Sequence, residues 1–161
     1  MELKIAHGNQ RVVKMAERLK DVLNQIEAPD DQSLASARWA FASALMQNLA
    51  VKERHLYTKL EQDSRPEVAA YFALSKADLL SRFEAYTEHM ATWSTSSALG
   101  QWSIYRVKAI HVIDIFVERL QTEQSLLAYA KRHNIDISTP SSATTNWTRK
   151  AFEVKDQVET R

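Results

Sequence analysis

The chain has 161 residues, a formal net charge of +1 at pH 7 and no cysteine. This length suits one domain with a sizeable core and is short for two. Without cysteine the chain has no disulfide, no thiolate metal site and no cysteine nucleophile, which fits a reducing compartment. Because lysine and arginine are interspersed with aspartate and glutamate, we expect no phosphate-binding surface and no nucleic acid partner.

Turn-forming residues are scarce, since the chain has two glycines and three prolines, whereas 45% of its residues are hydrophobic. A fold rich in β-strands would need turn residues about every ten positions, so we expect long helices with few connections. Residues 1–7 lack an apolar run of signal-peptide length, and no stretch approaches the roughly 20 apolar residues that span a bilayer. We therefore expect a soluble, cytoplasmic protein without membrane contact.

Four stretches carry apolar residues at helical spacing, over a wide arc in the second. In the first stretch the spacings alternate between four and three, the pattern of a helix packed lengthwise in a bundle. The first predicted helix covers residues 5–27. Gly8 followed by Asn9 leaves a second option open, a later start with Asn9 as the N-cap. The second predicted helix covers residues 34–60, after a stop and an N-cap signal in residues 28–31.

The third predicted helix begins at Pro66, a residue favoured in the first turn of a helix, and runs through Trp93. A polar connection, residues 94–100, leads to the fourth predicted helix, residues 102–130. Four helices of this length with short connections favour an up-down-up-down bundle with antiparallel neighbours. We therefore predict an all-α fold.

The chain divides into a predicted four-helix bundle, residues 1–137, and a tail, residues 138–161. The first part of the tail, residues 138–145, is rich in serine and threonine and is predicted to be a linker. A short amphipathic helix is expected to follow, because apolar residues recur at helical spacing; they are Trp147, Ala151, Val154 and Val158. Two roles stay open for this helix, packing back on the bundle and contacting a partner or a second copy.

Polar side chains on the apolar stripes are the candidates for function, because burying one without a partner costs a few kcal/mol. A lysine or arginine at a stripe edge usually extends to solvent, and an asparagine often bonds a nearby carbonyl. Their occurrence on all four helices nevertheless predicts a shared cluster. The predicted interior polar cluster comprises Asn9, Asn48, Lys52, Lys76, Arg119 and Glu123.

Histidine chemistry has little support in the sequence. No two of the five histidines lie three or four residues apart on one helix, as a metal site would favour; they are His7, His55, His89, His111 and His133. No Ser-His-Asp or Cys-His pattern and no glycine-rich phosphate loop is present. We therefore predict no enzymatic activity and no catalytic residue.

The second predicted helix contains the run NLAVKERHLYTKL, in which three residues separate Asn48 from Lys52 and Leu56-Tyr57 follows. This run is similar to the second-helix pattern of the hemerythrin-like (HHE cation-binding) family, which reads His, three residues, Glu, then Leu-Tyr/Phe-Pro. Arg119 and Glu123 echo the same spacing on the fourth helix. Aromatic residues also stand about where bacterial members of the family place them, namely Trp39, Tyr86, Trp93 and Trp102.

The resemblance covers about residues 5–130 and implies a bundle whose histidines and carboxylates hold two irons that bind oxygen or sense iron and redox state. At the ligand positions, however, this chain has the six residues of the predicted cluster, and only Glu123 is a ligand-type side chain. Ammonium and guanidinium groups have no lone pair to donate at neutral pH. The resemblance therefore implies that cations occupy the space of the metal ions, with Glu123 as the counter-charge and no cofactor bound.

The first of three functional hypotheses is a metal-free binding or regulatory module, such as one used in signalling. It would contact a protein partner or a second copy through the helical surface and the tail.

The second hypothesis is a working non-haem diiron protein with a different set of ligands, drawn from His7, His55, Glu53, His89 and Glu123. The third is a histidine phosphotransfer module with an exposed acceptor, His55 or His89, near Lys59 or Lys52. No glycine follows either histidine at the spacing that such modules use to admit a docking receiver.

Overall fold

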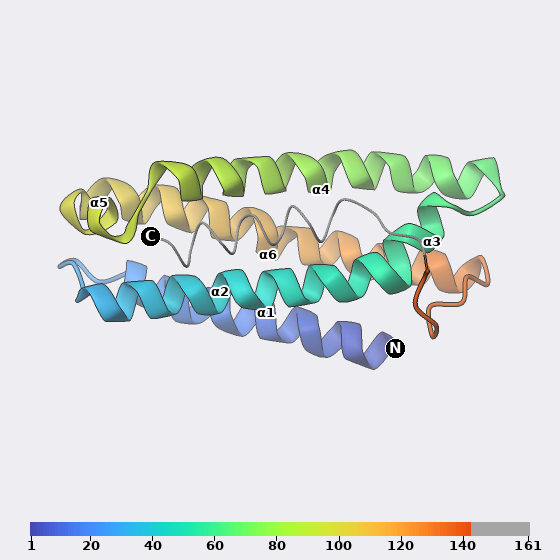
Figure 1. The fold of residues 1–161 in the computed structure, drawn as a ribbon, viewed down its shortest axis with the longest axis horizontal. Helices are drawn as coiled ribbons and strands as arrows, with labels where there is room; N and C mark the ends of the chain where they lie inside the picture. The colour runs from blue at the N-terminus through green and yellow to red at the C-terminus, as the bar shows by residue number, and fades with distance from the viewer. Residues whose placement is uncertain (143–161) are drawn as a thin grey trace.

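The computed structural model describes residues 1–142, which form an all-α fold of four long helices and shorter ones (Figure 1). Successive long helices run in opposite directions along the bundle (Figure 1). The prediction of an up-down-up-down four-helix bundle is therefore confirmed. The long helices are α1 (Glu2–Leu23), α2 (Asp31–Lys52), α4 (Pro66–Thr92) and α6 (Trp102–Arg132).

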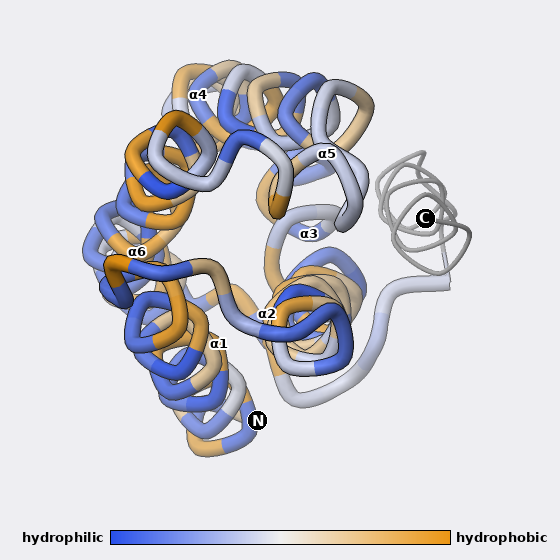
Figure 2. The backbone as a smooth tube through the Cα atoms, turned by 90° about the vertical axis from the view of Figure 1, so that its left-hand side faces the viewer, coloured by the Kyte–Doolittle hydropathy of each residue, from blue (hydrophilic) through white to orange (hydrophobic). Residues whose placement is uncertain are grey.

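Seen along its axis, the bundle has α1, α2, α4 and α6 at its four corners (Figure 2). Each of the four helices contributes buried apolar residues to one core. The pairs α1–α2, α1–α6 and α4–α6 pack directly against each other, whereas α2 and α4 make fewer close approaches. Aromatic rings fill much of the space between the helices. The Phe83 ring meets the Phe116 ring edge-on at 5.3 Å between centroids, and Tyr57 stacks on Phe72 at 5.5 Å, so the core has little free volume.

The second predicted helix keeps one direction but changes its helix type along its length. After α2 the chain passes through one π-helical turn, η1 (Glu53–Tyr57), into a last turn, α3 (Thr58–Glu61). The hydrogen bond that closes η1 runs from the Thr58 N–H to the Glu53 carbonyl, five residues back. Such π turns often occur at functional sites, and this one follows Lys52 directly.

The first helix and the third connection differ from the predictions. Helix α1 begins at Glu2, so Asn9 lies inside the helix and is not its N-cap, and α1 ends at Leu23, before the predicted end. The predicted connection 94–100 contains a short helix, α5 (Thr95–Gly100). Its N-cap is Ser94, which satisfies an otherwise unpaired N–H of the first turn.

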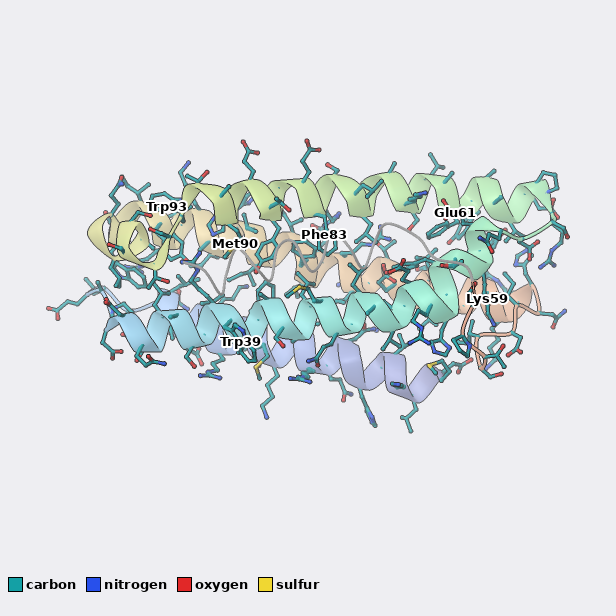
Figure 3. The ribbon with its side chains drawn as sticks, in the orientation of Figure 1. Trp39, Lys59, Glu61, Phe83, Met90 and Trp93 are labelled. Atoms are coloured by element: carbon teal, nitrogen blue, oxygen red, sulfur yellow. The ribbon has the colours of Figure 1, made fainter. Side chains whose placement is uncertain are left out.

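After α6 the chain returns along the bundle end and stays attached to it. The Lys59 ammonium donates to the Thr139 hydroxyl at 3.0 Å, and the Ser141 N–H donates to the Arg54 carbonyl at 2.8 Å. Figure 3 shows Lys59 and Glu61 at the end of the bundle opposite to Trp93. The described chain therefore ends beside η1, and the predicted short C-terminal helix, residues 147–158, lies outside the described residues.

None of the helices in the described part of the chain is both long and apolar enough to cross a bilayer.

Candidate functional site

Three of the six predicted interior residues, Lys52, Arg119 and Glu123, meet in the core of the bundle. Each of the three residues is at most 2% exposed. The Arg119 Nε donates to Glu123 Oε1 at 2.8 Å, and the Lys52 Nζ lies 3.7 Å from Glu123 Oε2. One carboxylate from α6 thus joins a guanidinium of the same helix to an ammonium of α2, and these three residues are called the charge cluster below.

The charge cluster continues outward to the surface of α4. The Arg119 guanidinium also donates to Asp78 Oδ2 at 2.7 Å and to the Ser75 carbonyl at 2.9 Å. Asp78 accepts a second bond from Arg82 at 2.9 Å, and Arg82 lies 3.6 Å from Glu118. Six side chains of alternating sign therefore run from the core to solvent, in the order Lys52, Glu123, Arg119, Asp78, Arg82 and Glu118.

Helix α1 contributes to this region through an asparagine pair. The Asn48 amide on α2 donates to the Asn9 Oδ1 at 3.1 Å. A Cβ added to Gly8 would lie 2.6 Å from the Asn48 Nδ2, closer than real Cβ atoms come. A side chain at position 8 would therefore displace the Asn48 amide from its place beside Asn9.

Lys76 lies apart from the predicted cluster. It is 34% exposed at the side chain and forms an ion pair with Glu61 of α3. The flexible stem lets its ammonium reach toward the bundle end and solvent, as long cationic side chains at a stripe edge usually do. The contribution of α4 to the cluster comes instead from Ser75 and Asp78.

A cavity of about 20 Å³ adjoins the charge cluster, enough for about one water molecule. Asn48, Lys52 and Tyr57 line it together with Arg119 and Glu123. The Glu123 Oε2 atom is buried and accepts no hydrogen bond of ordinary geometry from the described residues. Because η1 is a π turn, Lys52 and Tyr57, five residues apart, both face this cavity.

Burial and charge decide the ionisation of these groups. Burial lowers the pKa of Lys52 to about 8, although the Glu123 carboxylate opposes the shift. Burial, reinforced by the negative charge of Glu123, raises the pKa of the Tyr57 hydroxyl well above its usual value. For Arg119, burial is the largest single cause and lowers the pKa, but the charge of Glu123, with Tyr57 and Asp78, outweighs it in sum and the pKa is raised. At neutral pH Lys52 and Arg119 are therefore cations, and the Tyr57 phenol is neutral.

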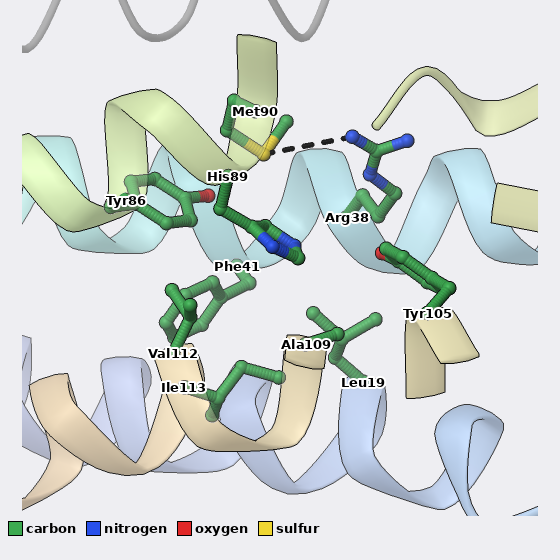
Figure 4. Close-up of a pocket in the computed structure, with 10 residues that line it drawn as sticks. All are labelled: Leu19, Arg38, Phe41, Tyr86, His89, Met90, Tyr105, Ala109, Val112 and Ile113. Atoms are coloured by element: carbon green, nitrogen blue, oxygen red, sulfur yellow. Dashed lines mark hydrogen bonds between the residues drawn. The ribbon is translucent and has the colours of Figure 1, made fainter. Parts of the chain in front are cut away.

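A second buried cation, Arg38, lines a small cavity together with His89 and Tyr105 (Figure 4). Its guanidinium donates to the Trp93 carbonyl at 2.6 Å and to the Thr95 hydroxyl at 3.2 Å, and it lies 5.8 Å from the centre of the Tyr105 ring. A cation at the C-terminal carbonyls of α4 also complements the helix dipole. The adjoining cavity is about 10 Å³, too small for a ligand, so Arg38 holds the α4–α5 connection in place.

The histidines that the phosphotransfer hypothesis needs are not exposed. His89 stacks on Tyr105 with 5.6 Å between ring centres, and burial, with the charges of Arg38 and Lys108, lowers its pKa to about 4. His55 is buried, and its Nδ1 lies 2.9 Å from the Ile137 carbonyl. The expectation of an exposed acceptor at either position is therefore wrong.

The alternative ligand set for two irons is not gathered at one place. Within residues 1–142, no three His, Cys, Asp or Glu side chains lie close enough together to hold a metal ion. Glu53 and Glu123 are both buried, but each lies outside any such group.

The fold and the site together define a helical bundle with a buried, ion-paired charge cluster. Comparison of the chain with protein-family models, with curated proteins and with solved structures finds no match. The resemblance to the hemerythrin-like family therefore rests on the motif residues alone and stays a prediction.

Several residues of the site were not predicted. Asp78 and Arg82 stand four residues apart on α4, a spacing that signals an ion pair but not its link to the core. Arg38 precedes Phe41 by three residues on the buried arc of α2, which was a usable signal for an inward cation. Tyr57 is part of the run NLAVKERHLYTKL, which carries the family resemblance. Its place beside Lys52 at the inner cavity depends on the π turn η1, which the sequence pattern did not predict.

Removing the buried carboxylate should destabilise the fold far more than removing the exposed one at the other end of the same row of charges. Glu123→Ala is expected to lower the free energy of unfolding by about 3–5 kcal/mol, because it leaves two buried cations without their counter-charge. The matched control, Glu118→Ala, removes a side chain that is 71% exposed. It should change the free energy of unfolding by about 0.5 kcal/mol or less. Denaturant titration measures both, and equal effects would contradict the cluster.

Lys52 should give the stability of the protein a pH dependence above pH 8. Its folded pKa of about 8 lies below its usual value of 10.5, so between these values the unfolded chain binds the extra proton. The contribution of Lys52 to stability is therefore lowest below pH 8 and rises with pH by about 3 kcal/mol in total. The free energy of unfolding of the wild type and of Lys52→Met is measured between pH 7.5 and 10.5. With rising pH the wild type should gain stability relative to the variant. A difference between the two proteins that does not change with pH would contradict the burial of the ammonium.

Proposed function

We propose that this protein is a non-catalytic binding and regulatory module, built on a hemerythrin-like frame that has exchanged its metal centre for the charge cluster. The observation that carries the proposal is the contact of Arg119 Nε with Glu123 Oε1 at 2.8 Å, with the Lys52 ammonium 3.7 Å from the other carboxylate oxygen. The one ligand-type side chain of the family pattern is thus already neutralised by two cations.

Electrostatics argues against metal binding at this place. A divalent cation would have to approach Glu123 within about 2.2 Å while an ammonium and a guanidinium stand beside the same carboxylate. Repulsion between like charges in a site of low dielectric amounts to several kcal/mol. The free volume, about 20 Å³, holds a water molecule and no larger ligand.

The surface of α1 and α6 offers a place where binding would influence the cluster. A groove of about 380 Å³ lies between these helices, within the volume range of ligand sites. Its apolar lining is Ala6, Val13, Leu120 and Leu127, and its polar lining is Asn9, Gln10, Lys14, Glu17 and Gln124. Leu120 lines both this groove and the inner cavity, and Asn9 bonds Asn48 of that cavity. A protein segment seated in the groove would therefore press on side chains that hold the cluster.

No observation favours the two other functions. A diiron centre needs donors that the described structure does not gather. A phosphotransfer module needs an exposed histidine, whereas His55 is buried and His89 is half-buried, stacked on Tyr105.

Elemental analysis of protein purified without chelator tests the metal-free assignment. We expect far less than one iron per chain and no visible absorption band, before and after anaerobic addition of ferrous iron, because the cations of the cluster exclude it. Stoichiometric iron with an oxo-bridge band would overturn the proposal and establish an oxygen- or iron-responsive protein.

The binding half of the proposal is tested in cells that produce the protein with a photo-crosslinking amino acid at Gln124, in the groove, or at Val107, on the exposed side of α6. A discrete adduct with one partner, formed in cells from Gln124 and not from Val107, is the expected result. Equal, diffuse labelling from both positions would contradict a role for the groove.

A further inference from the structure

The contact between α1 and α6 is bridged in one half and open in the other. Toward the C-terminal end of α1, Lys20 forms an ion pair with Asp114 of α6. Toward its N-terminal end, the α1–α6 groove lies between the two helices. Four polar side chains that line the groove form no hydrogen bond or ion pair with residues 1–142; they are Gln10, Lys14, Glu17 and Gln124. These groups are available to a bound partner.

The apolar residues of the groove stand at two levels. Ala6 and Val13 lie seven residues apart on α1, and Leu120 and Leu127 lie seven residues apart on α6. Each pair is separated by about 10.5 Å along its helix. Because α1 and α6 run in opposite directions (Figure 1), Leu127 lies toward the Ala6 end of the groove and Leu120 toward the Val13 end.

This spacing matches a helix better than an extended segment. A helix presents residues seven apart on the same face, with the same rise of about 10.5 Å. An extended segment presents side chains on one face about every 6.8 Å, so successive side chains fall at about 6.8 and 13.6 Å and miss the second level. The spacing of the apolar residues therefore favours a helical occupant.

Amide side chains occupy the space between the two levels. Gln124 lies between Leu120 and Leu127 on α6, and Asn9 and Gln10 hold the corresponding place on α1. An apolar side chain pressed against these amides would remove them from water without a hydrogen bond, at a cost of about 1–3 kcal/mol for each group left unpaired. The occupant should therefore carry a polar residue three or four positions after its first apolar residue.

Charge distinguishes the Val13 end of the groove from the Ala6 end. Lys14 follows Val13 directly, and Glu17 stands one turn further along α1. Both side chains are exposed. A partner complementary to this end carries an acidic residue that faces Lys14 and a basic residue one turn away that faces Glu17, and such pairs fix the direction in which a helix binds.

We propose that the α1–α6 groove binds an amphipathic helix of a partner protein. This helix has two large apolar residues seven positions apart, a polar residue between them, and charges opposite to those of Lys14 and Glu17 at one end. The inference rests on the proposed function and names the kind of partner that the groove takes. The bound helix would lie beside α1 and α6 as a fifth helix, in contact with Asn9 and Leu120, which connect the groove to the inner cavity.

Selection from a displayed library of random peptides of about 16 residues, or four helical turns, tests the proposal on the full chain. The blocked variant is Ala6→Trp, which fills the groove at an exposed position. Its matched control, Val107→Trp, places the same bulk on the exposed side of α6. Circular dichroism verifies that both variants fold. Groove binders are the peptides that bind the wild type and Val107→Trp but bind Ala6→Trp at least about tenfold more weakly.

The groove binders are expected to share apolar residues seven positions apart, with a polar residue between them and an acidic residue at one end. Lys14→Glu should weaken their binding about threefold or more, because it places two like charges opposite each other. Replacing the acidic residue of the peptide by lysine should restore the affinity for Lys14→Glu. A loss of folding in this variant would not produce such a rescue.

Groove binders with apolar residues at every second position, or with no response to Lys14→Glu, would overturn the helical partner and leave the proposed function standing. A dimer of the chain that Ala6→Trp dissociates in sedimentation would assign the groove to a second copy and also overturn the inference. The absence of groove binders would overturn it as well, and crosslinking from Gln124 then decides separately whether the proposed function fails with it.

Discussion

The burial of Glu123 beside Arg119 is the constraint that orders the rest of this bundle. Taking two such ions out of water costs several kcal/mol each, and their attraction offsets this only when the remaining polar atoms are also satisfied. The partners come from other helices, with Lys52 on α2 and both Ser75 and Asp78 on α4. A shift of α4 or α2 by one turn would leave a buried ion unpaired, so the cluster fixes the register of three helices.

Helix α1 is tied into the same arrangement by a smaller contact. The Asn9–Asn48 hydrogen bond joins α1 to α2, and Gly8 leaves room for the Asn48 amide. The same asparagines connect the α1–α6 groove to the inner cavity. The polar interior is therefore linked to the surface on two sides, through Asn9 at the groove and through Asp78 at the edge of α4. This is a suitable arrangement for a module whose core responds to what binds outside.

The four long helices were predictable because apolar spacing follows directly from helix geometry. The inward direction of Lys52, Arg119 and Glu123 was predictable for the same reason. Lys76 was not, because a lysine at the edge of a stripe has enough reach to pair with Glu61 near solvent. The role of Arg38 depends on the Trp93 carbonyl of a distant turn, which no local pattern in the sequence reveals.

The most direct test of the account is the coupling free energy between Lys52 and Glu123 in a double-mutant cycle with Lys52→Met and Glu123→Gln. The account predicts that the two substitutions are not additive, and that Lys52→Met recovers about 1–3 kcal/mol of unfolding free energy in the Glu123→Gln background, because it removes a cation that has lost its counter-charge. Additive effects within about 0.5 kcal/mol would contradict a shared, buried charge cluster at the centre of the bundle.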